Sequence, residues 1–396
     1  MKNKIQELIS NSFEEIVDIR RHIHANPELS FKEYKTSQFI QQKLTEFGVP
    51  FDNNIAENGV VGYIRGKNPN KKVIALRADF DALPIQEEND VPYKSTKPGI
   101  MHACGHDAHT ASLLGATKAL KHIEGELEGT IKLIFQPAEE RLPGGASLMI
   151  KEGVLENPMV SNILGQHVHP SMEVGKIGIH PGRFMASADE IDVTIYGKMG
   201  HGAMPHNAID PILISSHIIT GLQQIISRNC DPIIPSVLTF GSIQSSGGTY
   251  NIIPNVVTLK GTFRTMDEKW RFDAHKRMTK MAKMIAEGMG GKCDFHITVG
   301  YPFLINDVPF TQRCRQAAIE YLGKENVIDL PKRMTAEDFA YYTHETKGCF
   351  YRLGVGNVAK GITSGVHTPT FNIDESSLKV GAGLMAWLAV KELQAM

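Results

Sequence analysis

The sequence predicts an α/β protein in which helices cover a mixed sheet and a ferredoxin-like domain is inserted. Ahead of residue 184, helical patterns alternate with short β-branched runs at 73–78, 130–135 and 162–167, which is typical of a helix-covered sheet. From about residue 190 the order becomes strand, helix, strand, strand, helix, strand, the βαββαβ order of the ferredoxin-like unit. A chain of 396 residues is too long for one ordinary core, so two domains are expected.

The inserted domain is expected to span residues 184–299. Its strands are predicted at 190–197, 236–243, 256–264 and 293–299, and its helices at 209–228 and 267–288. Helix–strand alternation then resumes, with a strand at 350–356 and a last helix at 375–394. The simplest interpretation is a discontinuous larger domain, residues 1–183 and 300–396, that contains the small one.

Composition and charge narrow the class of protein. Hydrophobic residues make up 42% and charged residues 21% of the chain, and the net charge is −1, which argues against nucleic acid or an anionic membrane as a partner. The start "MKNKIQELIS" has no apolar run of the secretory type, so we expect a cytoplasmic protein. Five scattered cysteines without CxxC spacing indicate neither a disulfide framework nor a zinc ribbon.

The densest group of possible ligands is "MHACGHDAHT" at 101–110, which opens a helical stretch predicted to reach about residue 123. Cys104 and His106 suit Zn²⁺ or a similar ion, and Gly105 between them allows a tight turn. Two alternatives remain for this stretch alone. It could be a helix start, where Asp107 favours the helix dipole and the histidines pack, or it could carry a redox thiol.

Other polar segments follow the predicted strands, and in open α/β sheets such segments converge at the carboxyl ends of the strands. "DFDALP" follows the first strand and "QPAEE" the second, while the third ends in "GQHVHP". In "QPAEE", one carboxylate could bind a metal and its neighbour act on water, although a charged loop is common. His167 and His169 would face the same way on a continuing strand, and "GVHTP" at 365–369 adds a loop histidine.

Nine motifs in one order resemble the dinuclear-metal amidohydrolase family. That family includes hippurate hydrolases, indole-acetyl amino acid hydrolases and N-acetyldiaminopimelate deacetylases and, more distantly, aminoacylases and glutamate carboxypeptidases. The resemblance covers nearly the whole chain. Its motifs are "RRHIHANPELSFKE", "LRADFDALPI", "MHACGHDAHTA", "IFQPAEE", "GQHVHP", "GKMGHGAMPH", "NIIPNVVTLKGTFR", "TAEDFAYY" and "HTPTFNID".

The resemblance implies a role for each matching residue of the larger domain. Two divalent ions, Zn, Mn, Co or Ni, would be held by Cys104, His106, Glu140, His167 and His367. Glu139 would be the general base. The family pattern of Gly, any residue, His, two residues and Pro selects His167, with His169 as the runner-up. Asp79 and Asp81 would orient ligands or serve as turn residues, and His109 would pack or support a ligand. Glu337 and Asp338 in "TAEDFAYY" receive no role.

The resemblance also implies that the inserted domain is a lid and dimerisation domain. His201, between two glycines, would stabilise the oxyanion, in its own subunit or in a partner. Asn251 and Arg264 would hold the substrate carboxylate, a task that suits the planar fork of arginine. A Gly-rich turn and a surface ion pair are the plainer interpretations of these residues.

The expected activity is therefore metal-dependent hydrolysis of the amide in N-acyl amino acids, in a homodimer or higher homo-oligomer. A metallo-dipeptidase or carboxypeptidase acting on small peptides is the alternative within the enzyme class. A non-catalytic metal or peptide-binding protein on the same fold is the alternative from another class. The acyl group, the amino acid preference and the native metal are not readable from the sequence.

Overall fold

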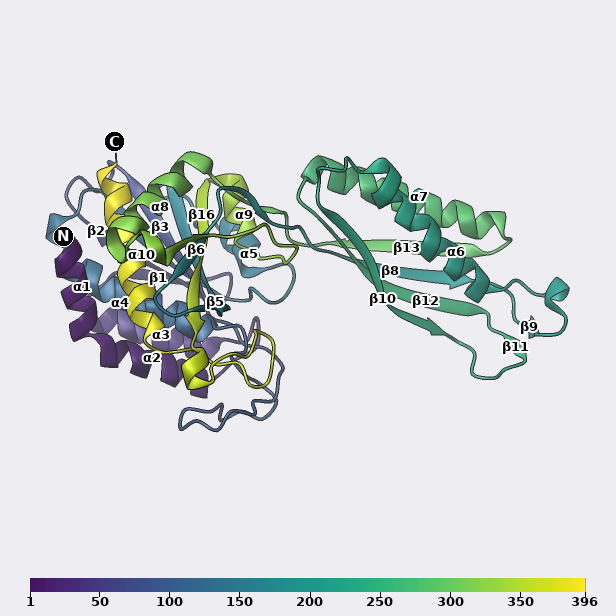
Figure 1. Ribbon diagram of the computed structural model, residues 1–396, viewed down its shortest axis with the longest axis horizontal. Coiled ribbons are helices and arrows are strands. Elements are labelled where there is room, and N and C mark those ends of the chain that lie inside the picture. Colours follow the sequence, from purple (N-terminus) through teal and green to yellow (C-terminus); the bar gives the residue numbers. More distant parts are fainter. Residues whose placement is uncertain (396) are drawn as a thin grey trace. The chain divides into compact units, whose positions relative to one another are not determined.

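The computed structural model describes residues 1–395 and divides into two compact units (Figure 1). The large unit contains Met1–Phe184, Ile305–Lys332 and the chain from Asp338 onward, and the small unit contains Met185–Leu304 and Arg333–Glu337. Residues 300–304 and 333–337 thus group with the small unit and not with the larger domain. Backbone hydrogen bonds explain this, since Ala186 donates to the carbonyl of Arg333 and Ala188 to that of Tyr301.

The large unit is built on an eight-stranded mixed sheet, in the order β1-β2-β4-β3-β5-β16-β6-β15. Its four central strands, β4, β3, β5 and β16, run parallel. The strands are β1 Phe51–Ile55, β2 Gly59–Arg65, β3 Val73–Asp79, β4 Thr130–Gln136, β5 Asn162–Glu173, β6 Ile177–Ile179, β15 Val327–Asp329 and β16 Lys347–Gly356. Two further short strands are β7 Gly182–Met185 and β14 Leu304–Asn306. The predicted α/β class with a mixed sheet is confirmed.

Helices bury both faces of the central strands. Every residue of β3 and β4 is buried, as expected for parallel strands covered on both sides. The helix α4 packs against α2 and α10. The helices are α1 Lys2–Asn11, α2 Phe13–Ala25, α3 Tyr34–Glu46, α4 His106–His122, α5 Gly145–Lys151, α8 Val308–Leu322, α9 Ala340–Glu345 and α10 Ser377–Gln394, with short turns η1 Glu124–Glu126, η4 Lys324–Asn326 and η5 Val358–Lys360.

The small unit has the predicted βαββαβ order and a four-stranded antiparallel sheet, β10-β12-β8-β13. Burial alternates along β8, so one face of the sheet packs on the two helices. Its elements are β8 Asp189–Tyr196, β9 Gly200–His201, η2 Pro205–Asn207, α6 Pro211–Gln224, the π-helical turn η3 Ile225–Asn229, β10 Ser236–Ser245, β11 Ile252–Ile253, β12 Val256–Thr265, α7 Glu268–Gly288 and β13 Lys292–Val299.

A buried ionic cluster joins the first strand of the small unit to its last helix. Arg271 on α7 donates through two nitrogens to Asp189 at the start of β8, at 2.9 and 2.5 Å. His275, one turn further along α7, lies 2.8 Å from the same carboxylate.

Between residues 1 and 395, the chain has no helix of the length and apolarity that crossing a membrane requires.

Candidate metal centre

Three neighbouring parallel strands deliver polar side chains to one edge of the large sheet. β3 ends at Asp79, which pairs in register with Gln136 at the end of β4, and β5 carries His167 at the middle of its length. The loops after β3 and β4 contain Asp81 and the pair Glu139–Glu140. The expected convergence of these segments therefore occurs because the strands are parallel and adjacent.

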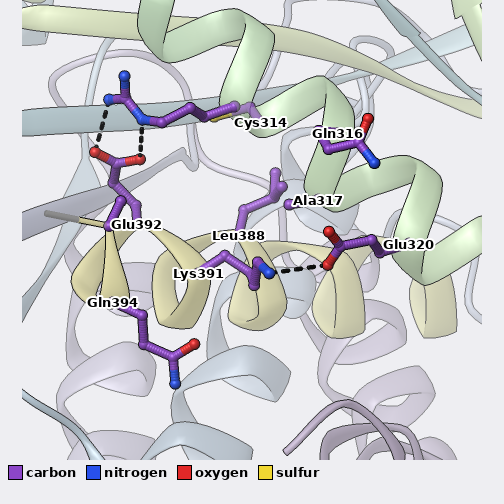
Figure 2. A pocket seen from close by; sticks show the side chains of 10 residues that line it. Cys314, Gln316, Ala317, Glu320, Leu388, Lys391, Glu392 and Gln394 are labelled. Atoms are coloured by element: carbon purple, nitrogen blue, oxygen red, sulfur yellow. Dashed lines mark hydrogen bonds and ion pairs between the residues drawn. The ribbon is translucent and has the colours of Figure 1, made fainter.

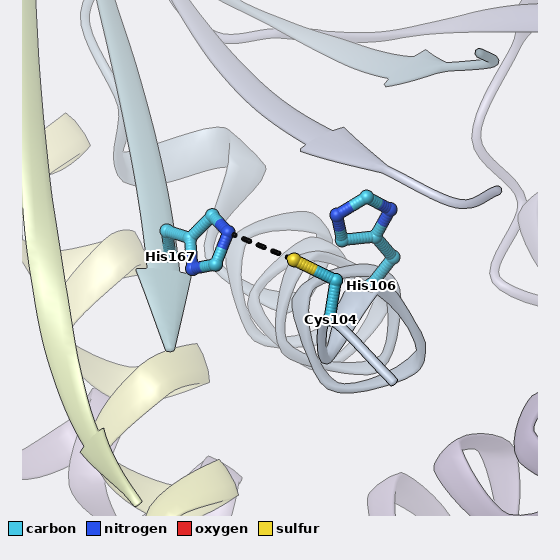
Figure 3. Close-up of side chains that lie close together, drawn as sticks. All are labelled: Cys104, His106 and His167. Carbon is cyan, nitrogen blue, oxygen red and sulfur yellow. Dashed lines mark hydrogen bonds between the residues drawn. The ribbon is translucent and has the colours of Figure 1, made fainter. Parts of the chain in front are cut away.

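A tight turn before α4 brings Cys104 and His106 to the same edge. Gly105, the N-cap residue, has φ +84°, and a Cβ there would lie 2.6 Å from a methyl carbon of Val168, so glycine is required. Cys104 Sγ lies 3.4 Å from Nε2 of His167, as Figure 3 shows with His106 beside them. From the loop after η5, Nε2 of His367 lies 3.3 Å from the same sulfur.

Hydrogen bonds at Nδ1 leave the Nε2 atoms of two histidines available. His167 Nδ1 lies 2.9 Å from the carbonyl of Val168, and His106 Nδ1 lies 3.0 Å from Asp81 Oδ1. In the neutral form of each ring Nδ1 donates and the lone pair is on Nε2, as in metal-binding histidines held by a carboxylate or carbonyl. Nε2 of His106 is buried and has no hydrogen-bond partner among the described residues.

The loop after β4 fixes the two adjacent glutamates. Ala138 has φ +52°, and its N–H donates to buried Glu33 at 2.8 Å. The N–H of Glu140 donates to Asp81 at 3.0 Å, while Glu139 Oε1 accepts from the N–H of Asp338 at 3.3 Å. The two carboxylates are thereby separately held, and Oε1 of Glu140 lies 3.1 Å from Nε2 of the half-exposed His367.

The predicted ligands of the large unit therefore meet in overlapping groups of donor atoms, each group within 4.8 Å. One group joins Cys104 with His106 and His167, and a second joins Cys104 with Glu140 and His367. A third joins Glu139 and Glu140 with His106. His169 is in none of these groups. This soft and borderline set of thiolate, imidazole and carboxylate suits Zn²⁺ and the neighbouring transition ions, and the unpartnered Nε2 of His106 fits the same interpretation.

The predicted residues of the small unit lie at two ends of its sheet. His201 in β9 pairs with Ile252 of β11, and Gly202 donates to the carbonyl of Asn251 at 2.7 Å, so His201 and Asn251 are neighbours. Arg264 lies near the other end of β12, where its Nη1 donates to the carbonyl of Met334 at 3.1 Å. Eight residue steps along β12 separate these ends by about 26 Å. Within one chain, Asn251 and Arg264 cannot both hold one carboxylate.

Comparison with known proteins identifies the family of this chain. The model of peptidase family M20/M25/M40 matches residues 75–391. The N-acyl-L-amino acid amidohydrolase of Geobacillus stearothermophilus is 42% identical over 305 residues, covering 77% of this chain and 81% of that protein. Thermostable carboxypeptidase 2 of Saccharolobus solfataricus is 38% identical over 394 residues, covering 99% and 98%. The chain belongs to peptidase family M20/M25/M40.

A solved structure of the same family has the same fold. The YXEP protein of Bacillus subtilis, described as a dinuclear metal binding peptidase from the M20 family, is 35% identical and has a TM-score of 0.84 over 98% of this chain and 100% of that one. The resemblance drawn from the nine motifs is thus confirmed, and this M20 chain is a hydrolase.

The charges around these donor atoms favour the protonated forms of Cys104 and His106 when no ion is bound. Burial, with the nearby carboxylates Glu140 and Glu139, raises the pKa of the Cys104 thiol well above its usual value. Burial alone would lower the pKa of His106, but Asp79 and Asp81 raise it to about 10. Burial lowers the pKa of His167 well below its usual value. An ion must therefore displace protons from the thiol and from His106, which couples its binding to pH.

Sequence reasoning missed a buried network beneath the donor atoms. Arg77 is fully buried on β3 and donates to Asp79 and Asp338 at 2.6 Å each. Asp79 also lies 2.5 Å from Nδ1 of His109, whose Nε2 accepts from the N–H of Val168 at 2.9 Å. His109 is thus engaged at both ring nitrogens, in agreement with a supporting role. Asp338, which had no role, fixes Glu139 through its backbone.

Proposed function

We propose that this M20 hydrolase cleaves the amide bond of N-acyl amino acids at a centre of two divalent ions, with Zn, Mn, Co and Ni as the candidates. The main support for this proposal is that Cys104 belongs to two groups of donor atoms at once. One group contains His106 and His167, and the other contains Glu140 and His367. Cys104 would therefore be available as a thiolate ligand to two adjacent ions. The dinuclear description of the YXEP protein supports the same number.

Each residue of the large unit then has a chemical task. Cys104, His106, Glu140, His167 and His367 would hold the ions, which when bound would lower the pKa of water toward about 7 and polarise the amide carbonyl. Glu139 would accept the proton of the attacking water and deliver it to the leaving amine. Its position suits this, since it is buried beside the donors and held by a backbone N–H.

His201 suits the task of an oxyanion donor. Its Nδ1 accepts a hydrogen bond from the N–H of Ala203 at 3.0 Å, so the proton of the neutral ring is on Nε2. The ring is exposed and can donate that proton to a developing oxyanion, an interaction typically worth roughly 3 to 4 kcal/mol. We propose that the small unit dimerises the protein and that His201 and Asn251 serve the partner subunit, while Arg264 serves its own.

The separation of the two ends of the small sheet supports this division. Ser187, where the chain enters the small unit, pairs through its backbone with Thr265, next to Arg264. His201 and Asn251 lie at the opposite end of β12. A substrate carboxylate held by both Asn251 and Arg264 would therefore need residues from two chains.

The acyl group is tested by a substrate panel. Release of free amino acid is measured from N-acetyl, N-benzoyl and indole-acetyl amino acids and from dipeptides, with metal-loaded protein. Hydrolysis of the N-acyl amino acids above that of the dipeptides supports the proposal. Preference for dipeptides would favour the peptidase alternative, which the carboxypeptidase relative supports. No hydrolysis with metal bound would contradict the proposal.

A further inference from the structure

The motif "RRHIH" places a charged arginine in the protein interior, where an unpaired charge would be costly. Arg20 lies on α2, and its side chain is completely buried, although arginine is almost never fully buried unless it is paired. The proposed mechanism does not use it. Its hydrogen bonds reveal which parts of the chain it joins.

One side of the Arg20 guanidinium holds the first turn of α4. Nε donates to Asp107 Oδ2 at 2.7 Å, and Nδ1 of His24, one turn further along α2, lies 2.8 Å from the same oxygen. Asp107 directly follows His106. Because successive helix residues point about 100° apart, His106 turns toward Asp81 while Asp107 turns toward α2. The hydrogen bonds to Asp107 therefore fix the orientation of His106 on this turn.

The other side of the same guanidinium holds the segment that follows His367. Nη2 of Arg20 donates to Asn372 at 2.9 Å and Nη1 to Glu375 at 3.2 Å. His367 has φ +61°, a left-handed backbone that a non-glycine residue keeps only when its surroundings hold it. Its N–H donates to the carbonyl of Ala103 at 2.7 Å. The two segments are thus joined beside the ligands and again at Arg20.

His24 extends this link to a third segment. Its second nitrogen, Nε2, lies 3.1 Å from Glu87 Oε1. Burial would lower the pKa of His24, but the carboxylates at its two nitrogens raise it. Glu87 accepts from Asn89, whose amide also donates to the carbonyl of Phe371 at 2.9 Å. Residues 87–89 therefore brace the stretch between His367 and Asn372.

We propose that Arg20 is a positioning residue for the metal centre. Through Asp107 and Asn372 it holds segments 101–107 and 367–375 in the arrangement that brings Cys104, His106 and His367 together before an ion binds. This inference rests on the proposed function, since it concerns the ligands assigned there. Cutting either link keeps all the ligands in the chain but loosens their spacing, and partners behind metal ligands typically change metal affinity about 10- to 100-fold.

The test measures the dissociation constant of Mn²⁺ from the chelated full-length protein by calorimetry, with Co²⁺ absorption as a report on the thiolate. Arg20→Met and Asn372→Ala are each expected to raise the constant about 10- to 100-fold. The double variant should bind Mn²⁺ only slightly more weakly than Arg20→Met alone, because both substitutions remove the same link between the two segments. Arg20→Lys should not restore affinity, since an ammonium lacks the planar fork that reaches two segments.

Arg313→Met is the matched control. Arg313 lies on α8 of the same unit and donates to buried Glu392 at 2.9 and 2.8 Å. Figure 2 shows Glu392 in this pair, beside a cavity of about 270 Å³ lined by α8 and α10. Glu392 is about 22 Å along α10 from Ser377. The control should lower the melting temperature and leave the dissociation constant unchanged.

Two outcomes separate the hypotheses. Wild-type affinity in Arg20→Met and Asn372→Ala, with the melting temperature lowered as in the control, would overturn the inference and leave Arg20 a structural residue. Should Arg20→Met fail to fold, Asn372→Ala and Arg20→Lys decide by the same criterion, because both keep a cation beside Asp107. A wild-type chain that binds no ion would overturn the proposed function instead.

Discussion

Replacing Glu139 with glutamine is expected to remove most of the turnover while leaving the ions bound. Glu139 is buried, and its Oε1 accepts the backbone N–H of Asp338 at 3.3 Å. A glutamine has the same size, and its carbonyl oxygen can still accept that hydrogen bond, so only the basic carboxylate is lost. General acid–base groups contribute typically about 10²- to 10⁴-fold, which corresponds to about 3 to 5 kcal/mol of activation free energy.

The assay compares kcat of the wild type and Glu139→Gln at saturating N-acyl amino acid, with metal content measured on the same samples. Glu392→Gln is the matched control, because Glu392 is equally buried in the same unit but pairs with Arg313 and Lys72. The control should keep its kcat. A Glu139→Gln variant with two bound ions and near-normal kcat would refute the assignment of Glu139 as the base.

Three further predictions concern the small unit. Arg264→Ala should raise KM for substrates with a free carboxylate and leave KM for the amidated analogues unchanged; equal losses would argue against the anchor. Mixing inactive His201→Ala with inactive Glu139→Ala chains should restore part of the activity, and no recovery despite verified subunit exchange would place His201 in its own subunit's site. Burial would raise the pKa of Asp189, but hydrogen bonds from its histidine and arginine partners lower it. Its contribution to stability is therefore complete above about pH 4 and is lost as pH falls through the folded-state pKa. Melting curves of Asp189→Asn should accordingly depend less on pH in this acid range than those of the wild type.

The sequence predicts the edge of the sheet where the donors meet because that placement depends on local patterns. The runs at 73–78 and 130–135 are mostly apolar, as buried parallel strands are, and parallel neighbours end at the same edge. The choice between His167 and His169 is different, since both lie on one face of a strand. The family pattern selected His167, and the structure places it beside Cys104.

The supporting charges could not be predicted from local patterns. Arg20 and Asp107 are 87 positions apart, and Arg77 and Asp338 are 261 apart. A buried ion pair produces no periodic pattern in the sequence. Each of these residues therefore cannot be told from a surface charge until the fold shows its partner. The motif "NIIPNVVTLKGTFR" is the opposite case, because Asn251 and Arg264 are close in the sequence but are kept apart by the strand between them.

The most direct test of a two-ion hydrolase counts the ions that activity requires. The chelated protein is titrated with Mn²⁺, Zn²⁺, Co²⁺ or Ni²⁺, and the rate of amino acid release from the best N-acyl substrate is followed against equivalents added. We expect chelation to abolish hydrolysis and full activity to return at two equivalents per chain. Activity that survives verified removal of metal, or that saturates at one equivalent, would contradict the account.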